Sequence, residues 1–146
     1  MIRRATADDA PTMAVLGPAF HSAIACADPL APEAYEHMLR VYLTDPSIAF
    51  FVLEIEGYIM GGIGAFCMPF LWHPSVKHCV EMGFFIAEPF RGQGHAKGLM
   101  DALEGWAKEQ GASTVLMAVP ENNEILAGAL ERRGYAFYEA TFRKEI

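Results

Sequence analysis

Residues 80–106 decide the fold, and they read Val-Glu-Met-Gly-Phe-Phe-Ile-Ala-Glu-Pro-Phe-Arg-Gly-Gln-Gly-His-Ala-Lys-Gly-Leu-Met-Asp-Ala-Leu-Glu-Gly-Trp. The apolar run 82–86 predicts a buried strand, and a turn at Glu88 and Pro89 follows it. Further along, apolar residues recur at helical spacing, at Leu99, Met100, Leu103, Trp106 and Ala107. Charged residues occupy the opposite face, as in an amphipathic helix. The stretch therefore predicts a strand, a tight glycine-bearing loop and a long helix.

The loop in this stretch has the properties of an anion-binding site. The first N–H groups of a helix have no acceptor inside the helix, and the helix dipole places partial positive charge at the same end. Small residues let the oxygens of an anion approach the main chain closely, and Gly92, Gly94 and Ala96 are small. Arg91 and His95 add charge or a polar ring nearby. The loop is therefore predicted to hold a phosphate-bearing ligand.

The spacing of the loop residues indicates which kind of phosphate ligand the loop binds. A Walker loop is excluded because no Gly-Lys-Ser/Thr follows, and Gly92, Gly94 and Gly98 are spaced one residue too widely for a dinucleotide fingerprint. Arg91, Gly94 and Ala96 fit the pattern Gln/Arg-x-x-Gly-x-Gly/Ala. This loop resembles the acyl-CoA pyrophosphate loop of the GCN5-related N-acetyltransferases.

Other parts of the chain add to the resemblance. The opening Ile-Arg-Arg-Ala-Thr-Ala-Asp-Asp-Ala is similar to the first strand and helix start of that family, and Asn123 is followed eleven residues later by Gly134 and an aromatic residue. The resemblance implies that acetyl-CoA is the acyl donor. It assigns the pyrophosphate to Arg91, Gly92, Gln93, Gly94, His95 and Ala96. It also implies that backbone donors near Phe84 and Ile86 hold the acyl carbonyl and that Asn123 touches the pantetheine arm.

The rest of the sequence predicts further strands and helices. Before residue 80 we expect a strand at 2–5, a helix starting after Thr6 and interrupted at Gly17-Pro18, a helix at 33–43, strands at 48–54 and 58–66, and a long loop at 67–77. Glycines at 61, 62 and 64 indicate a bulge or another group packed close to the backbone. Trp72 and His73, in the long loop, are candidates for substrate contact.

After the long helix, which should end at Gly111, we expect a strand at 114–119, a helix at 123–133 and strand segments at 135–138 and 141–144. This order predicts a mixed α/β sheet, mostly antiparallel and flanked by about four helices, within one domain covering residues 1–146. The resemblance implies the same fold, the acyl-CoA N-acyltransferase fold.

Composition limits the classes of function. The chain has 146 residues, is 53% hydrophobic and carries a formal net charge of −7, which disfavours nucleic-acid binding and mildly favours cationic substrates such as amines. The absence of a signal-peptide core and of a long apolar run predicts a cytoplasmic protein with no membrane partner. Cys26, Cys67 and Cys79 are odd in number and widely spaced, so we expect buried, reduced thiols rather than a disulfide or a zinc site.

Glu81 is the candidate general base. It is a carboxylate on an apolar strand, and its neighbours Val80, Met82 and Phe84 should raise its pKa by desolvation. The alternatives are that Glu81 faces solvent at a strand end or pairs with an arginine. The family commonly places a tyrosine acid four residues before the glycine that ends the last helix, and that position here is Leu130. Either the thiolate leaves without a protein acid, or another residue serves.

Two functions follow. The first is an N-acetyltransferase that moves an acetyl group from acetyl-CoA to a primary amine of a small molecule or peptide, by direct transfer in a ternary complex. The second is a non-catalytic acyl-CoA sensor of the same fold, which the missing helix tyrosine permits. An unrelated nucleotide-binding α/β enzyme is disfavoured because no alternating βαβ units precede the loop. The five histidines offer no ligand-spaced pair, so no metal is expected, and a homodimer is compatible with the apolar composition.

Overall fold

The protein is built on a five-stranded mixed sheet in the order β1-β2-β3-β4-β5. The computed structural model describes residues 1–24, 28–121, 123–144 and 146. The strands are β1 (Ile2–Arg4), β2 (Ile48–Ile55), β3 (Tyr58–Phe70), β4 (His73–Ile86) and β5 (Ala112–Leu116). The first three pairings are antiparallel and β4 pairs with β5 in parallel. The predicted mixed, mostly antiparallel sheet is confirmed.

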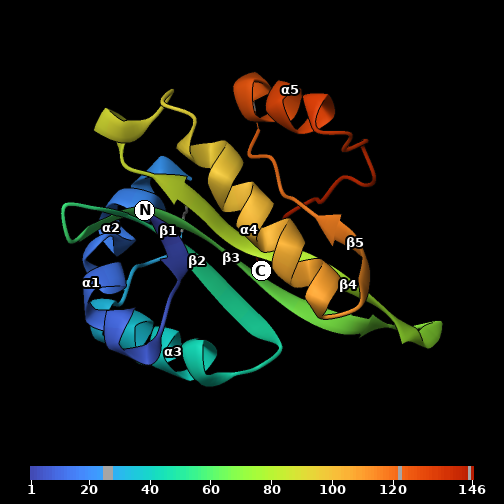
Figure 1. Cartoon of the computed structure of the whole chain (residues 1–146), viewed down its shortest axis with the longest axis horizontal. Helices are drawn as coiled ribbons and strands as arrows, with labels where there is room; N and C mark the ends of the chain where they lie inside the picture. The colour runs from blue at the N-terminus through green and yellow to red at the C-terminus, as the bar shows by residue number, and fades with distance from the viewer. Residues whose placement is uncertain (25–27, 122, 145) are drawn as a thin grey trace.

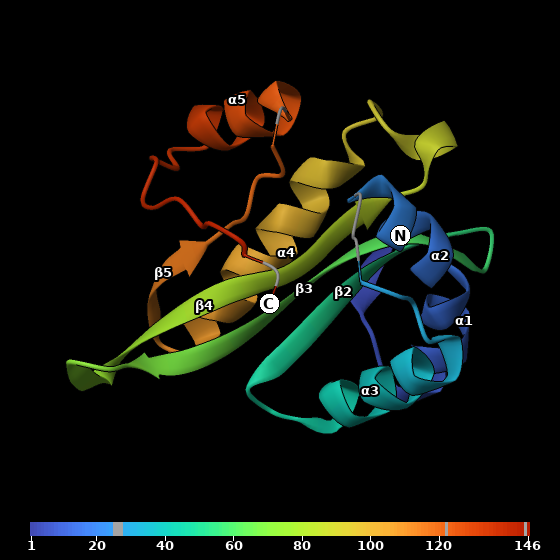
Figure 2. The same cartoon turned by 180° about the vertical axis from the view of Figure 1, so that it is seen from behind.

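Helices cover both faces of this sheet (Figures 1 and 2). They are α1 (Ala10–Val15), α2 (Gly17–Ala23), α3 (Pro32–Thr44), α4 (His95–Glu109) and α5 (Glu124–Arg132), with short 3-10 turns η1 (Ala7–Asp9) and η2 (Glu88–Phe90). The split expected at Gly17-Pro18 is the boundary between α1 and α2. In the described part of the chain, no helix is both long and apolar enough to span a membrane.

The alternation of side chains along β2 separates two cores. Phe51 and Leu53 belong to the larger core beneath α4, whereas Val52 belongs to a smaller core with Met13 and Leu16 of the α1 region. Successive strand residues point to opposite faces, so an uninterrupted apolar strand such as β2 must be covered on both sides. The run of apolar residues in β2 therefore requires the helix layers on both faces.

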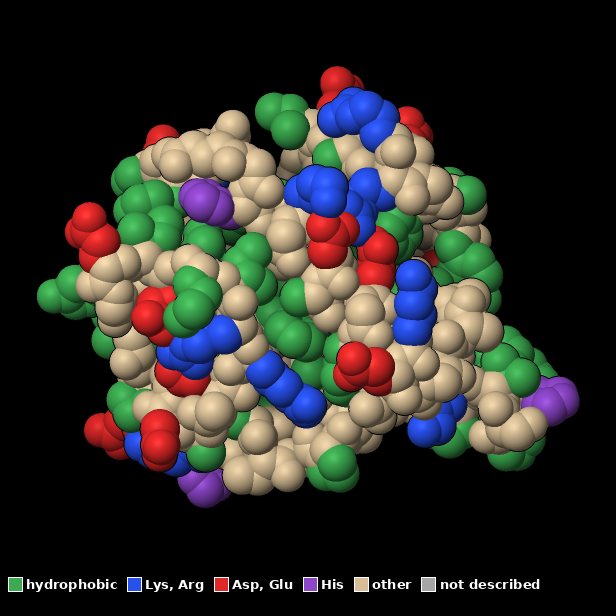
Figure 3. Space-filling view, viewed as in Figure 1, with side chains coloured by type: hydrophobic (Ala, Val, Ile, Leu, Met, Phe, Trp, Pro, Cys, Tyr) green, Lys and Arg blue, Asp and Glu red, His purple; other side chains and the backbone are tan. Residues whose placement is uncertain are grey.

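Helix α4 is fixed by the apolar stripe that the sequence predicts. Leu99 and Leu103 are fully buried, and Trp106 is nearly so. The opposite face carries charged residues such as Lys97 and Asp101, which pair across one turn at 2.6 Å. Figure 3 shows basic and acidic side chains side by side over α4 and α5. The helix axis, and with it the position of the helix N-terminus, is set by burial rather than by the exposed charges.

Strand β4 becomes an edge strand in its second half. Its last partner pair with β5 is Val80 with Leu116, and beyond that pair no strand lies on its outer side in the described part of the chain. A register shift in the β3–β4 pairing falls at the same place, between Gly64 and Ala65. The divergence of β4 and β5 leaves the main chain from Glu81 to Ile86 with one unpaired edge.

The segment 67–77 is not a long loop, and this prediction was wrong. Strands β3 and β4 continue into a hairpin whose turn lies at residues 71–72. Pro69 and Pro74 masked the strand signal, because proline is normally excluded from strands but is tolerated near a register shift and at strand ends. Trp72 and His73 lie at the hairpin tip, where the Trp72 side chain is 80% exposed.

The strands predicted at 135–138 and 141–144 are also absent. Residues 135–144 form no helix or strand, and Phe137 and Phe142 are 86% and 94% exposed. Strand patterning alone does not produce a strand, since a strand needs a neighbour to pair with. The segment is instead held by side chains, through Tyr135 to Glu104 at 3.0 Å and Arg143 to Asp28 at 3.2 Å.

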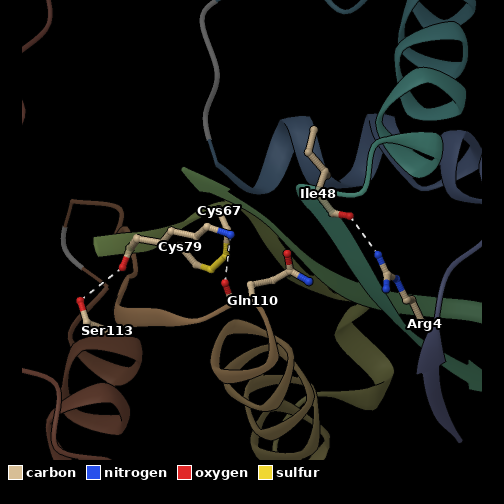
Figure 4. The surroundings of a disulfide bond; sticks show 7 residues. Arg4, Ile48, Cys67, Cys79, Gln110 and Ser113 are labelled. Atoms are coloured by element: carbon tan, nitrogen blue, oxygen red, sulfur yellow. Dashed lines mark hydrogen bonds between the residues drawn. A yellow bond between two sulfur atoms is a disulfide. The ribbon is translucent and has the colours of Figure 1, made fainter. Parts of the chain in front are cut away.

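The prediction of three reduced thiols is corrected for two of them. Cys67 on β3 and Cys79 on β4 are direct partners across the hairpin, with a Cα–Cα distance of 4.0 Å, and form a disulfide (Figure 4). Their sequence separation of 12 residues gives no pairing signal, because only the hairpin register brings them together. Cys26 lies outside the described residues.

Candidate active site

The loop between β4 and α4 is shaped by two glycines in the left-handed region. Gly92 has φ +74° and Gly94 has φ +83°, and a Cβ on either would meet nothing within 4 Å. Other residues rarely adopt this conformation. The loop is tied back to η2 by the Gln93 side chain, which donates to the Pro89 carbonyl at 2.8 Å. A tight, open loop therefore precedes the first turn of α4.

The main-chain donors of this loop face no protein acceptor. Within the described residues, no hydrogen-bond partner is found for the N–H groups of residues 92–96, and the first bond at this end runs from Lys97 N–H to the Gly94 carbonyl at 3.1 Å. The N-cap residue Gly94 has no side chain to supply an acceptor. Free donors at a helix N-terminus, with the positive end of the dipole, can bind a phosphate or pyrophosphate group.

Arg91 is exposed, and its guanidinium is held at the end of β4. Its Nε donates to the Ile86 carbonyl at 2.7 Å, and its guanidinium carbon lies 5.6 Å from the centre of the Phe85 ring. The remaining guanidinium N–H groups are not involved in that bond, so Arg91 can both anchor the loop and present positive charge at the loop.

The edge of β4 supplies main-chain donors close to the loop. Ala87 N–H donates to the Met60 carbonyl on β3 at 2.8 Å. Along a strand, successive residues direct their N–H and C=O groups to opposite edges. Ile86 and Phe84 therefore direct theirs to the unpaired edge, in agreement with the contact between the Ile86 carbonyl and Arg91.

Glu81 lies at the point where β4 and β5 separate. Its side chain is partly buried, and its Oε2 accepts a hydrogen bond from Ala118 N–H at 3.2 Å. Burial raises the pKa of Glu81 above its ordinary value, and the bond from Ala118 opposes this rise. Among the described residues Glu81 pairs with no arginine, and its carboxylate is partly buried and bound by a backbone donor, which the sequence did not suggest. Its role as general base stays a prediction.

Asn123 and Leu130 have clear local roles on α5. The Asn123 Oδ1 accepts from Leu126 N–H at 3.1 Å and so caps the helix. Leu130 is buried against the core under α4. Asn123 therefore has a structural role as the N-cap of α5, and its assignment to the pantetheine arm stays a prediction.

Most of the predicted site residues lie on one continuous stretch of the chain. Glu81, Phe84, Ile86 and the 91–96 loop follow one another along the end of β4 and into α4. Trp72 and His73 do not join them, because eight residues of strand, about 26 Å, separate His73 from Glu81. No group of three potential metal-binding side chains is found among the residues that the structure describes.

Sequence reasoning missed Ala118 as the partner of Glu81. Ala118 contributes a main-chain N–H, so its side chain carries no signal of that contact. It lies two residues beyond β5 and 37 residues from Glu81, and only the parallel pairing of β4 with β5 brings the two together.

Comparison with known proteins agrees with this geometry. The sequence profile of the acetyltransferase (GNAT) family matches residues 18–135. An uncharacterized N-acetyltransferase, YdgE of Bacillus subtilis (strain 168), is 28% identical over 115 residues, which is 78% of this chain and 71% of YdgE.

Solved structures show the same fold at low sequence identity. The ribosomal-protein-alanine N-acetyltransferase from Brucella melitensis biovar Abortus 2308 aligns with a TM-score of 0.77 at 18% identity, covering 100% of this chain and 99% of that one. AAC(6')-Iy, in complex with the bisubstrate analogue CoA-S-monomethyl-acetylneamine, aligns with a TM-score of 0.80 at 19% identity, covering 100% and 98%. With a loop of unpaired amides at the start of α4, a strand pair that separates beside it and a family match over most of its length, the chain belongs to the GNAT family of N-acetyltransferases.

Proposed function

We propose that this protein transfers the acetyl group of acetyl-CoA to a primary amine in a direct ternary complex. The observation that carries the proposal is the set of unpaired N–H groups at residues 92–96, next to the unpaired edge of β4. The first feature suits a pyrophosphate and the second suits an extended amide-bearing arm that ends in a thioester.

The proposed binding mode assigns a task to each part of the site. The pyrophosphate lies against the 92–96 amides, with Arg91 adding positive charge. The pantetheine arm follows the edge of β4, and the N–H groups of Phe84 or Ile86 donate to the thioester carbonyl. A donor aimed at that oxygen stabilises the negative charge that develops on it during attack. The amides and the strand edge are in place before the ligand binds, which favours a precise alignment of the two substrates.

Glu81 is proposed to accept the proton of the amine. The amine nitrogen attacks the thioester carbon, the C–N bond forms and the C–S bond breaks, so that CoA leaves as a thiolate. The proton lost by nitrogen passes to Glu81, directly or through one water. A carboxylate whose pKa is raised by burial is a better base near neutral pH than an exposed one.

No side-chain acid is assigned to the thiolate. Leu130, at the position where the family commonly carries a tyrosine, is buried and apolar. A thiolate is a good leaving group because its conjugate acid is moderately strong, with a pKa near 8.5 for a simple thiol. We therefore propose that the thiolate leaves and is protonated by solvent.

The acceptor class rests on chemistry and on the fold relatives. The solved structures with this fold include an aminoglycoside N-acetyltransferase and a ribosomal-protein-alanine N-acetyltransferase, as their names state. Both kinds of acceptor present a primary amine. We propose the same functional group for the acceptor of this chain, on a small molecule or a peptide.

Acetyl-CoA binding and thiol release test the proposal. A ligand that binds only the native state, at about 100 times its Kd, should stabilise the protein by about 2.7 kcal/mol. Acetyl-CoA should therefore raise the Tm, and CoA thiol should appear only when an amine is present. If millimolar acetyl-CoA leaves the Tm unchanged, the proposal is wrong.

The apolar Leu130 favours one alternative, a protein that binds acyl-CoA without turnover. A Tm shift with acetyl-CoA, combined with no thiol release over a broad amine panel, would support that alternative. Substitution Leu130→Tyr would then be expected to leave thiol release undetectable.

A further inference from the structure

A cavity lies between the sheet and helices α1, α2 and α3, on the face opposite α4. Its volume is about 160 Å³, and the lining residues that the structure describes include no Asp, Glu, Lys, Arg or His. Among these described residues, polar side-chain oxygens come only from the hydroxyls of Tyr35 and Tyr42. An apolar cavity of about 150 Å³ in another protein binds benzene, so this one has room for one ring of about six carbons.

Two neighbouring glycines let aromatic rings of the cavity lining pack directly onto the sheet. Gly64 on β3 and Gly83 on β4 are register partners, and neither places a side chain on this face. A Cβ on Gly83 would approach Cζ of Phe20 to 3.0 Å, and a Cβ on Gly64 would collide with the Phe50 ring. Aromatic rings from α2 and β2 therefore pack on bare backbone, and a side chain at either glycine would displace these rings, which line the cavity.

The cavity ends beside the proposed reaction site. Met82, Gly83 and Phe85 line it, and they lie among Glu81, Phe84 and Ile86 on the part of β4 that has no outer neighbour in the described chain. The cavity lining and Glu81 therefore belong to the same short stretch of β4, which has one unpaired edge.

Phe85 connects the cavity to the phosphate loop. Its ring lies 5.8 Å from the Phe20 ring on one side and 5.6 Å from the guanidinium carbon of Arg91 on the other. The wall of the cavity and the residue that anchors the loop are therefore in contact.

We propose that this cavity binds the apolar group of the acceptor, and that the substrate class is a primary amine joined by a short linker to one aromatic ring or a branched aliphatic group of similar size. This inference rests on the proposed acetyltransferase function and narrows its acceptor. The amino group extends past the edge of β4 to Glu81, while the apolar group occupies the cavity between the sheet and helices α1, α2 and α3.

The lining also selects against other amines. A polycation has charges along its whole length, and a second ammonium group in the cavity would lose its hydration without meeting a carboxylate. A very small amine reaches Glu81 but leaves the cavity unfilled and gains no apolar burial. Specificity therefore arises from two effects: burial of the apolar group favours the proposed substrates, and the cost of burying an unpaired ammonium group disfavours polycations.

An amine panel on the unmodified protein tests the proposal, with CoA thiol release as the readout. The panel contains 2-phenylethylamine, 3-methylbutylamine, ethylamine and spermidine. Burial of a phenyl or branched side chain should raise kcat/KM over that of ethylamine by about 30-fold. Equal or better turnover of spermidine or ethylamine would overturn this inference and leave the acetyltransferase function standing.

Failure of the cavity assignment can be distinguished from failure of the proposed acetyltransferase function. If acetyl-CoA raises the Tm and some amine releases thiol, the proposed function holds and the order of the amines decides the cavity assignment. If acetyl-CoA neither raises the Tm nor releases thiol with any amine, the proposed function fails and the cavity assignment fails with it.

Cavity-filling variants give a second test. Gly83→Ala and Leu16→Phe should each lower the ratio of kcat/KM for 2-phenylethylamine to that for ethylamine by about tenfold, because overpacking opposes ring entry. Gly105→Ala is the matched control, since Gly105 is on the exposed face of α4 with nothing within 4 Å of a Cβ. An unchanged ratio in folded Gly83→Ala and Leu16→Phe would overturn the inference, and the amine panel decides it if neither variant folds.

Discussion

The Glu81 carboxylate on β4 accepts a hydrogen bond from the Ala118 N–H, two residues beyond the end of β5, at 3.2 Å. This contact joins two strands at the point where they stop pairing with each other. It holds the carboxylate beside the strand edge that is proposed to receive the thioester. A backbone donor orients the carboxylate without adding a full positive charge, so burial remains the dominant influence on the pKa of Glu81.

Glu81→Gln should lower kcat by about 10²-fold or more, the range expected when a general base is lost. The glutamine oxygen can still accept from Ala118 N–H, so we expect the fold and the acetyl-CoA affinity to be retained. The acidic limb of the kcat/KM profile should also disappear. A pH profile with the wild-type shape would remove Glu81 from the mechanism.

The same residue should make stability depend on pH. The folded-state pKa of Glu81 is raised above its ordinary value of 4.5, so its contribution to stability is fully present below pH 4.5 and is lost as the pH rises through the folded pKa. The Tm of Glu81→Gln minus the Tm of the wild type should therefore increase as the pH rises. Thermal melts across this range measure the difference, and the exposed Glu139→Gln is the control that should show no such trend.

Gly94→Ala should weaken acetyl-CoA binding and destabilise the fold by about 1–2 kcal/mol, because Gly94 has φ +83°. Gly57 has the same φ and the same open surroundings, but it lies in the β2–β3 turn. Gly57→Ala should match the loss of stability and keep wild-type affinity, as measured by calorimetric titration. If Gly94→Ala and Gly57→Ala bound acetyl-CoA equally well, the loop before α4 would not be part of the binding site.

Arg133→Ala should destabilise the contact between α5 and α4. Arg133 lies 2.8 Å from both Asp101 and Glu104, and its side chain is only 17% exposed. Its hydrogen bonds to carboxylates are worth about 1–2 kcal/mol at this exposure. Denaturant unfolding should show that loss, whereas Arg132→Ala, next in sequence and exposed, should change stability by less than about 0.5 kcal/mol.

Reduction of the Cys67–Cys79 disulfide should lower stability by about 2–3 kcal/mol, the size expected for a bridge that closes a short loop. A Tm measured with and without reductant checks this value. The double variant Cys67→Ala/Cys79→Ala should show no response of the Tm to reductant. Titration of the unfolded, unreduced protein should find at most one free thiol among the three cysteines; finding three would contradict the pairing.

Much of the fold follows from local sequence. The helical spacing of Leu99, Leu103 and Trp106 fixes α4 and its buried face, and left-handed glycines fix the loop before it. These features depend on residues within one or two turns of each other. The family and the strand, loop and helix of residues 80–106 could therefore be recognised from the sequence.

Features that depend on pairing between distant residues could not be recognised in this way. The strand pattern of residues 135–144 does not lead to a strand, because a strand forms only where another strand offers its hydrogen bonds. The prolines near residues 69 and 74 likewise hid a hairpin whose register pairs Cys67 with Cys79.

The sequence by itself determined the mixed sheet, the long amphipathic helix and the loop that starts it, since each depends on short-range periodicity or on backbone freedom at glycine. Only the tertiary structure decided that Gly64 faces Gly83 beneath aromatic rings and that the Ala118 amide meets Glu81. The physical reason is that strand register places these atoms in contact, and register is set by the packing of the whole sheet rather than by any one segment.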